Sequence, residues 1–258
     1  MPVVEKDGLK VEFHRSGRGP DLLLLHSLLT ELTVFARVLP ALEARHRVTR
    51  INLPGFGASA PVALDTVAAH ADHVARVMDA LDLPRSTDIF GNGFGAFVAL
   101  ELAVRHGARM GRLIVADTLA AFPEPARVPF RGMAERVRAG GMAAVLDTAI
   151  ARMFPPEFAA ANAGVIEERR RALAAVEPQC FARACLALAE MDLRPQLPTV
   201  KNPARVMCGA LDQTTPPALA RELAAIIPGA RYEEIPGSGH CPMLEQPDSL
   251  VRLMGSHI

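Results

Sequence analysis

The stretch FGNGFGAFVALELAVRHG, residues 90–107, decides the fold of this chain. The residues STDIF, 86–90, predict a short strand, and the alanine- and valine-rich residues that follow the glycines predict a helix. Gly91, Gly93 and Gly95 lie between the two, so the connection must be a tight turn with small neighbours. The first turn of such a helix presents N–H groups without partners, which can bind a negatively charged oxygen.

Short apolar segments that alternate with amphipathic helices continue this pattern along the chain. An opening hairpin is predicted around Asp7-Gly8. Further strands are predicted at 21–26, 47–53, 111–117, 204–211 and 231–236, and a single helix is predicted over residues 33–45. Continuous apolar strands that alternate with helices favour a parallel sheet covered on both faces. The predicted fold class is therefore α/β, with a mostly parallel central sheet between helices.

The alternation stops in the middle of the chain, where helices joined by Gly and Pro turns are predicted and no strand is expected. We therefore predict a core formed by residues 1–118 and 198–258, with a helical cap, or lid, inserted over residues 119–197. One interpretation is a purely structural appendage. The other is a lid over a pocket at the carboxyl ends of the strands, where open α/β sheets bind ligands.

Composition narrows the class of partner. The chain has 258 residues, with 28 basic and 28 acidic side chains, so neither nucleic acid nor an anionic membrane surface is an expected partner. No signal peptide is recognised, and no apolar run approaches the roughly 18 residues of a membrane span. The four cysteines match neither a zinc site nor a redox pair. We expect a cytoplasmic protein that acts on a small molecule; the oligomeric state is left open.

Two backbone groups are candidates for binding an oxyanion. The N–H of Phe94 lies one residue beyond the centre of the turn, and the N–H of Leu28 follows the predicted strand 21–26. His26, next to that loop, is interpreted as a structural turn residue. The glycine spacing matches neither a dinucleotide fingerprint nor a P-loop, so nucleotide binding is not favoured.

An acid and a base follow two of the later predicted strands. Asp212 comes just after a buried strand, and Asp117 occupies the equivalent point one strand earlier and is the reserve candidate. We expect Thr214 or Thr215 to cap the next helix, which leaves Asp212 free. His240 lies in a glycine-rich loop that can turn back over the edge of the sheet.

These motifs resemble the α/β-hydrolase fold family. The resemblance rests on LLLLHSLLTELTVF, NLPGFGAS, FGNGFGAFVALELA, CGALDQTTPP and IPGSGHCPMLEQP, which span nearly the whole chain outside the lid. The most similar members are 3-oxoadipate enol-lactonases, and the hydrolases that cleave C–C bonds of ring-fission products are also similar. The resemblance implies that position 93 holds the nucleophile, and that Asp212 orients His240, which activates it. The implied reaction is hydrolysis of a small ester, a lactone or a ketone-activated C–C bond.

Glycine at position 93 departs from that family, whose members carry serine, or sometimes cysteine or aspartate, at the centre of the turn. Glycine has no side chain that could attack a substrate, so a covalent intermediate at this position is excluded. Three explanations stay open. The glycine is an engineered replacement that disables a hydrolase; or it is natural, and His240 with Asp212 acts as a general base in a lyase or a cofactor-independent oxygenase; or the protein is a pseudo-hydrolase that only binds a ligand.

The substrate pocket is expected to be mostly apolar. Its predicted lining consists of Ser27, Phe122, Phe130, Met153, Phe154 and Phe181. Arg127, Arg131 and Arg136 either bind a substrate carboxylate or form a solvated lid surface. No metal-binding pattern is recognised, and neither a metal nor a cofactor is expected.

Overall fold

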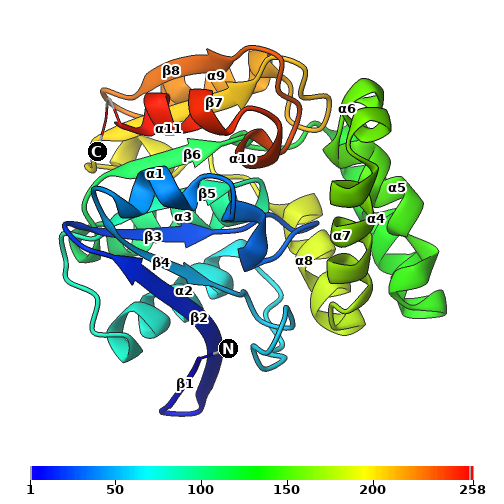
Figure 1. Cartoon of the computed structure of the whole chain (residues 1–258), viewed down its shortest axis with the longest axis horizontal. Coiled ribbons are helices and arrows are strands. Elements are labelled where there is room, and N and C mark those ends of the chain that lie inside the picture. The colour runs from blue at the N-terminus through cyan, green and yellow to red at the C-terminus, as the bar shows by residue number, and fades with distance from the viewer. Residues whose placement is uncertain (1, 256, 258) are drawn as a thin grey trace.

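The apolar segments of the sequence form the strands of one eight-stranded sheet (Figure 1). The computed structural model describes residues 2–255 and 257. The strands are β1 (Val3–Lys6), β2 (Leu9–Gly17), β3 (Asp21–Leu25), β4 (Arg47–Ile51), β5 (Asp88–Asn92), β6 (Leu113–Ala116), β7 (Ala204–Gly209) and β8 (Arg231–Ile235). Their order in the sheet is β1-β2-β4-β3-β5-β6-β7-β8. The β1–β2 and β2–β4 pairs are antiparallel, and the other pairs are parallel.

Helices cover both faces of this sheet, as the sequence predicted (Figure 1). The core helices are α1 (Leu39–Glu43), α2 (Val67–Ala80), α3 (Phe94–His106), α9 (Pro217–Ile226), α10 (Pro242–Glu245) and α11 (Pro247–Gly255). The single helix expected over residues 33–45 is wrong, because the structure divides it into the 3-10 helix η1 (Leu32–Phe35) and α1. Pro40 explains the division, since proline fits the first turn of a helix but not its interior.

The parallel register brings the carboxyl ends of the central strands to one edge of the sheet. Leu25 of β3 pairs with Gly91 of β5, and Ala116 of β6 pairs with both Asn92 of β5 and Met207 of β7. The segments that follow these strands therefore start side by side. Since β3, β5 and β7 are buried along their whole length, the sheet forms a rigid base for those segments.

The lid lies between β6 and β7 and gathers at one end of the sheet, beyond the tips of the parallel strands (Figure 1). Its helices are α4 (Glu124–Gly140), α5 (Leu146–Met153), α6 (Pro156–Ala161), α7 (Ala163–Ala174) and α8 (Pro178–Glu190). An isolated antiparallel bridge joins Ala121 to Asp192, where the chain enters and leaves the lid. The bridge closes the base of the insertion.

A buried ion pair fastens the lid to the core. Arg169 of α7 is only 2% exposed, and its guanidinium lies 3.0 Å from a carboxylate oxygen of Glu31. The same guanidinium donates to the hydroxyl of Thr33, at 2.8 Å, and to Glu168, at 2.6 Å. Because Glu31 is also buried, removal of the arginine would leave a carboxylate in a poorly solvated place without its partner.

We expect Arg169→Ala to lower the free energy of unfolding by about 3–5 kcal/mol, the usual cost of breaking a buried pair. The matched control is Arg170→Ala on the same helix, which removes an exposed pair with Asp147 and should cost less than about 1 kcal/mol. Urea unfolding followed by circular dichroism measures both. Equal changes in the two variants would show that Arg169 does not fasten the lid.

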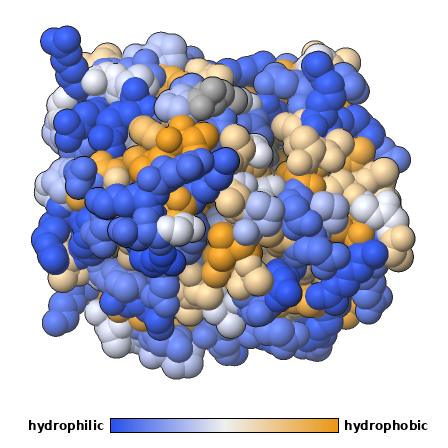
Figure 2. All heavy atoms as spheres, turned by 90° about the horizontal axis from the view of Figure 1, so that it is seen from below, coloured by the Kyte–Doolittle hydropathy of each residue, from blue (hydrophilic) through white to orange (hydrophobic). Residues whose placement is uncertain are grey.

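The surface is mostly polar on the face shown in Figure 2, where orange apolar areas are small and lie between blue hydrophilic residues. Among the residues described, no single helix is long and apolar enough to cross a membrane. The pair α7 and α8 meets the criteria of length and composition only when taken together, and the two helices are bent by 100°.

Candidate active site

The glycine turn between β5 and α3 has a backbone that few other residues adopt. Gly93 has φ 52° and ψ −119° and is the N-cap of α3. A Cβ at Gly91 would lie 2.4 Å from the carbonyl oxygen of Gly95, and one at Gly95 would lie 2.3 Å from that of Leu25. The glycines on either side are therefore required by close backbone packing, and the sharp turn projects position 93 towards the edge of the sheet.

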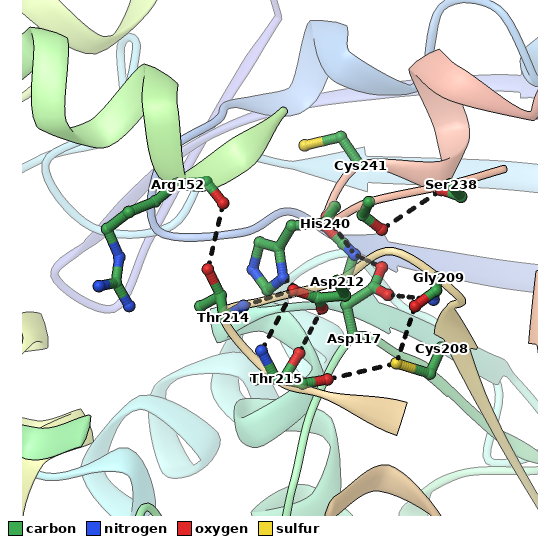
Figure 3. A network of polar contacts seen from close by, with 12 residues as sticks. Asp117, Arg152, Cys208, Gly209, Asp212, Thr214, Thr215, Ser238, His240 and Cys241 are labelled. Atoms are coloured by element: carbon green, nitrogen blue, oxygen red, sulfur yellow. Dashed lines mark hydrogen bonds and ion pairs between the residues drawn. The ribbon is translucent and has the colours of Figure 1, made fainter. Parts of the chain in front are cut away.

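His240 and Asp212 form a buried hydrogen-bonded pair (Figure 3). The pair faces the glycine turn, because a Cβ on Gly93 would lie 3.0 Å from Nε2 of His240. Nδ1 of His240 lies 2.8 Å from Oδ2 of Asp212. The carboxylate also accepts from the N–H groups of Thr214 and Thr215, at 2.7 and 3.1 Å, and from the Thr215 hydroxyl, at 2.5 Å. Because an ionised carboxylate can only accept, Nδ1 carries the proton, and Nε2 of His240 is left as the basic nitrogen.

The predicted helix cap after Asp212 is wrong. The N-cap of α9 is Pro216, which makes no side-chain capping bond, and the Thr215 hydroxyl donates to Asp212 instead. The threonines therefore fix the carboxylate that holds His240.

The two members of the pair shift each other's pKa in opposite directions. Burial lowers the pKa of His240, but the charge of Asp212 and the hydrogen bond between them outweigh it, so the pKa is raised. Burial raises the pKa of Asp212, but the charge of His240 and the bonds from His240 and Thr215 outweigh it, so the pKa is lowered. The arrangement therefore suits a carboxylate that stays ionised and a histidine that accepts and releases a proton.

The two predicted oxyanion donors line the same cavity as His240. Leu28, Phe94 and His240 all contribute to its wall, together with Gly93. Among the described residues, no hydrogen bond uses the N–H of Leu28 or of Phe94. Both groups are therefore available to an oxygen bound in the cavity.

His26 has the structural role that the sequence indicated. Its Nε2 accepts from the N–H of Leu53, at 3.0 Å, so Nδ1 carries the proton and donates to the carbonyl of Ser27, at 2.8 Å. Burial lowers the pKa of His26 to about 4, which keeps the ring neutral. The ring ties the loop after β3 to the segment after β4.

The inner cavity at His240 has a volume of ≈ 20 Å³, which is room for about one water molecule. Its wall is formed by Ser27, Leu28, Leu29, Gly93, Phe94, Phe97, Phe122, Phe130, Met133, Arg152, Leu188, Thr214, Thr215 and His240. A larger and more open cleft, of ≈ 880 Å³, lies between the lid segment 151–157 and the loops after β7 and β8. It shares Arg152, Thr214 and His240 with the inner cavity. A substrate larger than water therefore exceeds the volume of the inner cavity, whereas the outer cleft has room for one beside His240.

The predicted pocket lining is divided among three places. Ser27, Phe122 and Phe130 line the inner cavity. Met153 and Phe154 line the outer cleft instead, because α5 ends there. Phe181 is fully buried in the hydrophobic core and lines neither cavity, because the face of α8 that carries it packs inward.

Further lining residues were not anticipated, among them Phe97, Met133 and Leu188. Phe97 lies one helical turn after Gly93, so the period of α3 could have identified it. Met133 and Leu188 come from α4 and α8, and no feature of the sequence tells which lid faces meet.

The three lid arginines considered for binding a substrate carboxylate line neither the inner cavity nor the outer cleft. Arg127 donates to the carbonyl of Phe122, at 2.8 Å, and Arg131 pairs with Glu124 and Glu190, while Arg136 is exposed. Arg131 and Arg136 therefore belong to the lid surface, whereas the side chain of Arg127 is only 18% exposed and fits neither alternative.

Arg152, which the sequence did not single out, is the arginine that lines the cavity. Its guanidinium lies 5.2 Å from the centre of the Phe130 ring and extends away from the His240–Asp212 pair (Figure 3). Within residues 2–255 and 257, no carboxylate forms an ion pair with it. Burial lowers the pKa of Arg152, which shows that its charge is poorly solvated.

Asp117, the reserve acid, is not the hydrogen-bond partner of the His240 ring, because that place is taken by Asp212. It is fully buried, and its two oxygens accept from the side chain of Asn92, at 2.7 Å, and from the N–H of Gly209, at 2.8 Å. Ligand atoms of Asp117, Cys208 and Asp212 lie within 4.8 Å of one another. Burial raises the pKa of both Asp117 and Cys208, which disfavours the ionised forms that bind a metal.

A histidine and a carboxylate on the loops after the last two strands, placed opposite a strand–turn–helix elbow with two free N–H groups, define the class of α/β-hydrolase-fold enzymes. The chain belongs to the alpha/beta hydrolase family, whose profile matches residues 22–253. The predicted fold class and the family resemblance are thereby confirmed.

Similar proteins support this membership. The chain is 29% identical to 3-oxoadipate enol-lactonase 2 of Acinetobacter baylyi, over 89% of this chain and 85% of that protein. It is 31% identical to a pimeloyl-[acyl-carrier protein] methyl ester esterase of Aeromonas hydrophila, over 95% of this chain and 98% of that protein. It is also 31% identical to polyketide synthase ThaQ of Burkholderia thailandensis, of which it spans only 12%. The crystal structure of the enol-lactonase from Burkholderia xenovorans superposes with a TM-score of 0.90 at 28% identity, over 99% of this chain and 98% of that one.

Proposed function

We propose that this protein hydrolyses a small carboxylic ester or lactone, with His240 as the general base. The observation that carries the proposal is the intact His240–Asp212 pair, whose basic nitrogen is next to the cavity that Leu28 and Phe94 line. The base removes a proton from an attacking oxygen, and the two N–H groups bind the oxyanion that forms. Neither step requires a side chain at Gly93.

Hydrolysis is favoured over the other functions considered for such a site. A protein that only binds a ligand has no need of a carboxylate that holds a buried histidine by a 2.8 Å bond. Simple proton transfer uses the histidine but gives no role to two unengaged N–H donors on the opposite wall. The similar enol-lactonases and methyl ester esterases support the same class of reaction.

The side chains of the cavity wall suit a substrate with a carboxylate. The wall is mostly apolar, and Arg152 supplies a positive charge with no ion-pair partner in the described part of the chain. A guanidinium in such surroundings gains more from a carboxylate than one in water does, because charge-assisted hydrogen bonds strengthen as solvent is excluded. We therefore propose an ester or lactone that carries a free acid group.

We expect Arg152→Met to raise the KM for an acidic ester such as p-nitrophenyl hemisuccinate by about 10- to 100-fold, the effect of one charged hydrogen bond. The KM for neutral p-nitrophenyl acetate should change little. Arg170→Met, on the outer surface of the lid, is the matched control and should affect neither substrate. Equal effects of Arg152→Met on both esters would contradict a role in acid recognition.

The raised pKa of His240 sets the pH dependence. Only the neutral imidazole acts as a base, so kcat/KM should fall as the pH decreases through a pKa above the ordinary value of about 6.5. Asp212→Asn removes the charge that raises this pKa, so the acidic limb should move to lower pH while the maximal rate drops. A pH profile of kcat/KM for both proteins measures this. A limb that moves to higher pH, or does not move, would contradict the assignment.

The direct test of the proposed function is steady-state turnover of p-nitrophenyl acetate and of an enol-lactone by the unmodified chain. Turnover above the buffer rate supports the proposal. Binding of both compounds without turnover would leave only the ligand-binding explanation.

A further inference from the structure

The hydroxyl of Ser27 occupies the space that a side chain at position 93 would need. An ideal Cβ built on Gly93 would lie 2.3 Å from Oγ of Ser27 and 3.0 Å from Nε2 of His240. The first distance is shorter than real contacts allow, so the serine fills that volume. In the family, the nucleophilic side chain starts from position 93. In this protein, that position is bordered by Oγ of Ser27 and by Nε2 of His240.

The backbone of Ser27 is held firmly in this position. Its N–H donates to the Thr30 hydroxyl, at 3.0 Å, and its carbonyl accepts from Nδ1 of His26, at 2.8 Å, and from the N–H of Thr30, at 3.2 Å. The His26 ring is fixed in turn by Leu53. Such fixing is what a reacting group requires, because catalysis depends on placement to within a fraction of an ångström.

The hydroxyl of Ser27 is not engaged by another polar group of the described residues, and it makes no hydrogen bond to His240. Across the described ranges, no hydrogen bond of the structure uses its Oγ, although the residue is only 2% exposed. The side chain borders the cavity whose wall includes Leu28, Phe94 and His240. Leu28 follows Ser27 directly, so the serine has an oxyanion donor at the next residue, as the nucleophile of an elbow does.

We propose that Ser27 is the nucleophile of this enzyme, in place of the side chain that Gly93 lacks. The inference rests on the proposed ester or lactone hydrolysis and names its attacking group. It also explains how the paired acid and histidine can remain functional although the turn has no hydroxyl of its own.

The reaction balances as an acyl transfer in two halves. Oγ of Ser27 bonds to the carbonyl carbon, its proton passes to Nε2 of His240, and the carbonyl electron pair moves to the oxygen bound by Leu28 and Phe94. Collapse breaks the bond to the alkoxide, which takes the proton from His240 and leaves an ester on Ser27. Water then attacks that ester in the same way and releases the acid and the free hydroxyl.

Reaction with an alkyl fluorophosphonate, followed by peptide mass spectrometry, tests this inference. The hydroxyl should displace fluoride and give a single adduct on the peptide that contains Ser27. Ser27→Ala should abolish the adduct and lower kcat for p-nitrophenyl acetate by about 10³-fold or more. Ser86→Ala, at an exposed serine before β5, is the control and should change neither. Circular dichroism and thermal unfolding establish that Ser27→Ala is folded.

The outcomes separate this inference from the proposed function. Turnover that persists in Ser27→Ala, with no adduct in the unmodified chain, means that water attacks directly; hydrolysis then stands and the serine nucleophile is overturned. An adduct at another residue also overturns it. If the unmodified chain gives neither turnover nor an adduct, the proposed function fails and this inference fails with it.

Discussion

Replacement of His240 by alanine is expected to lower kcat/KM for an ester by about 10²- to 10⁴-fold, the range that a positioned general base contributes. The ring is fixed by Asp212 at 2.8 Å, and the raised pKa shows that its charged form is stabilised when it takes up a proton. Without the imidazole, no other base borders the inner cavity among its described lining residues. Stopped-flow or steady-state release of p-nitrophenol measures the loss.

The matched control is His106→Gln. His106 also pairs with a carboxylate, Asp72, at 2.7 Å, but it lies at the end of α3 and is partly exposed. The control should keep full activity. A similar loss of kcat/KM in both variants would indicate a general effect of histidine replacement on the fold. Retention of kcat/KM in His240→Ala would contradict the proposed role of His240.

Gly93→Ala and Gly93→Ser are expected to differ from each other by about 10³-fold or more in kcat, with the serine variant the more active. Both add a Cβ that would lie 2.3 Å from Oγ of Ser27 and must push that hydroxyl aside. In the alanine variant, the Ser27 hydroxyl is displaced from its position beside His240, and the new methyl group supplies no hydroxyl in its place. The serine variant supplies a new hydroxyl from the turn, next to His240.

The comparison is matched, because both variants place a side chain on a backbone with φ 52° and should lose a similar 1–3 kcal/mol, roughly, of stability. Thermal unfolding checks that the two losses agree. Equal activities in Gly93→Ala, Gly93→Ser and the unmodified chain would show that the turn takes no part in the reaction.

Most of the fold could be predicted because local features of the sequence agree with it. The leucine run of β3, buried on both faces, and the glycines around position 93 each specify one local structure. The single helix predicted over residues 33–45 from its apolar spacing was wrong. A proline inside the pattern, Pro40, outweighs that spacing and divides the segment into two helices.

The candidate acid and base could be located because each follows a strand of a parallel sheet, whose ends meet at one edge. The sequence could not show that Asp117 bonds to Asn92 and Gly209, which leaves Asp212 as the partner of His240. Such choices depend on side-chain directions at the edge of the sheet.

The positions of Ser27 and Arg152 in the site could not be predicted from local sequence patterns. Ser27 was expected in the pocket, but its approach to Gly93 depends on the spacing between the loop after β3 and the turn after β5. Arg152 is one of many lid arginines, and only the packing of α5 over the cavity distinguishes it from the surface residues. The positions of Ser27 and Arg152 therefore depend on contacts between segments that are far apart in the sequence.

The central claim is that His240 and the two N–H donors of Leu28 and Phe94 together stabilise a transition state for ester hydrolysis. A crystal structure with a stable alkyl phosphonate monoester tests it most directly. We predict one phosphonyl oxygen at about 2.7–3.1 Å from the N–H nitrogens of Leu28 and Phe94, and another facing Nε2 of His240. A phosphonate bound elsewhere, with those N–H groups and the histidine untouched, would contradict the claim.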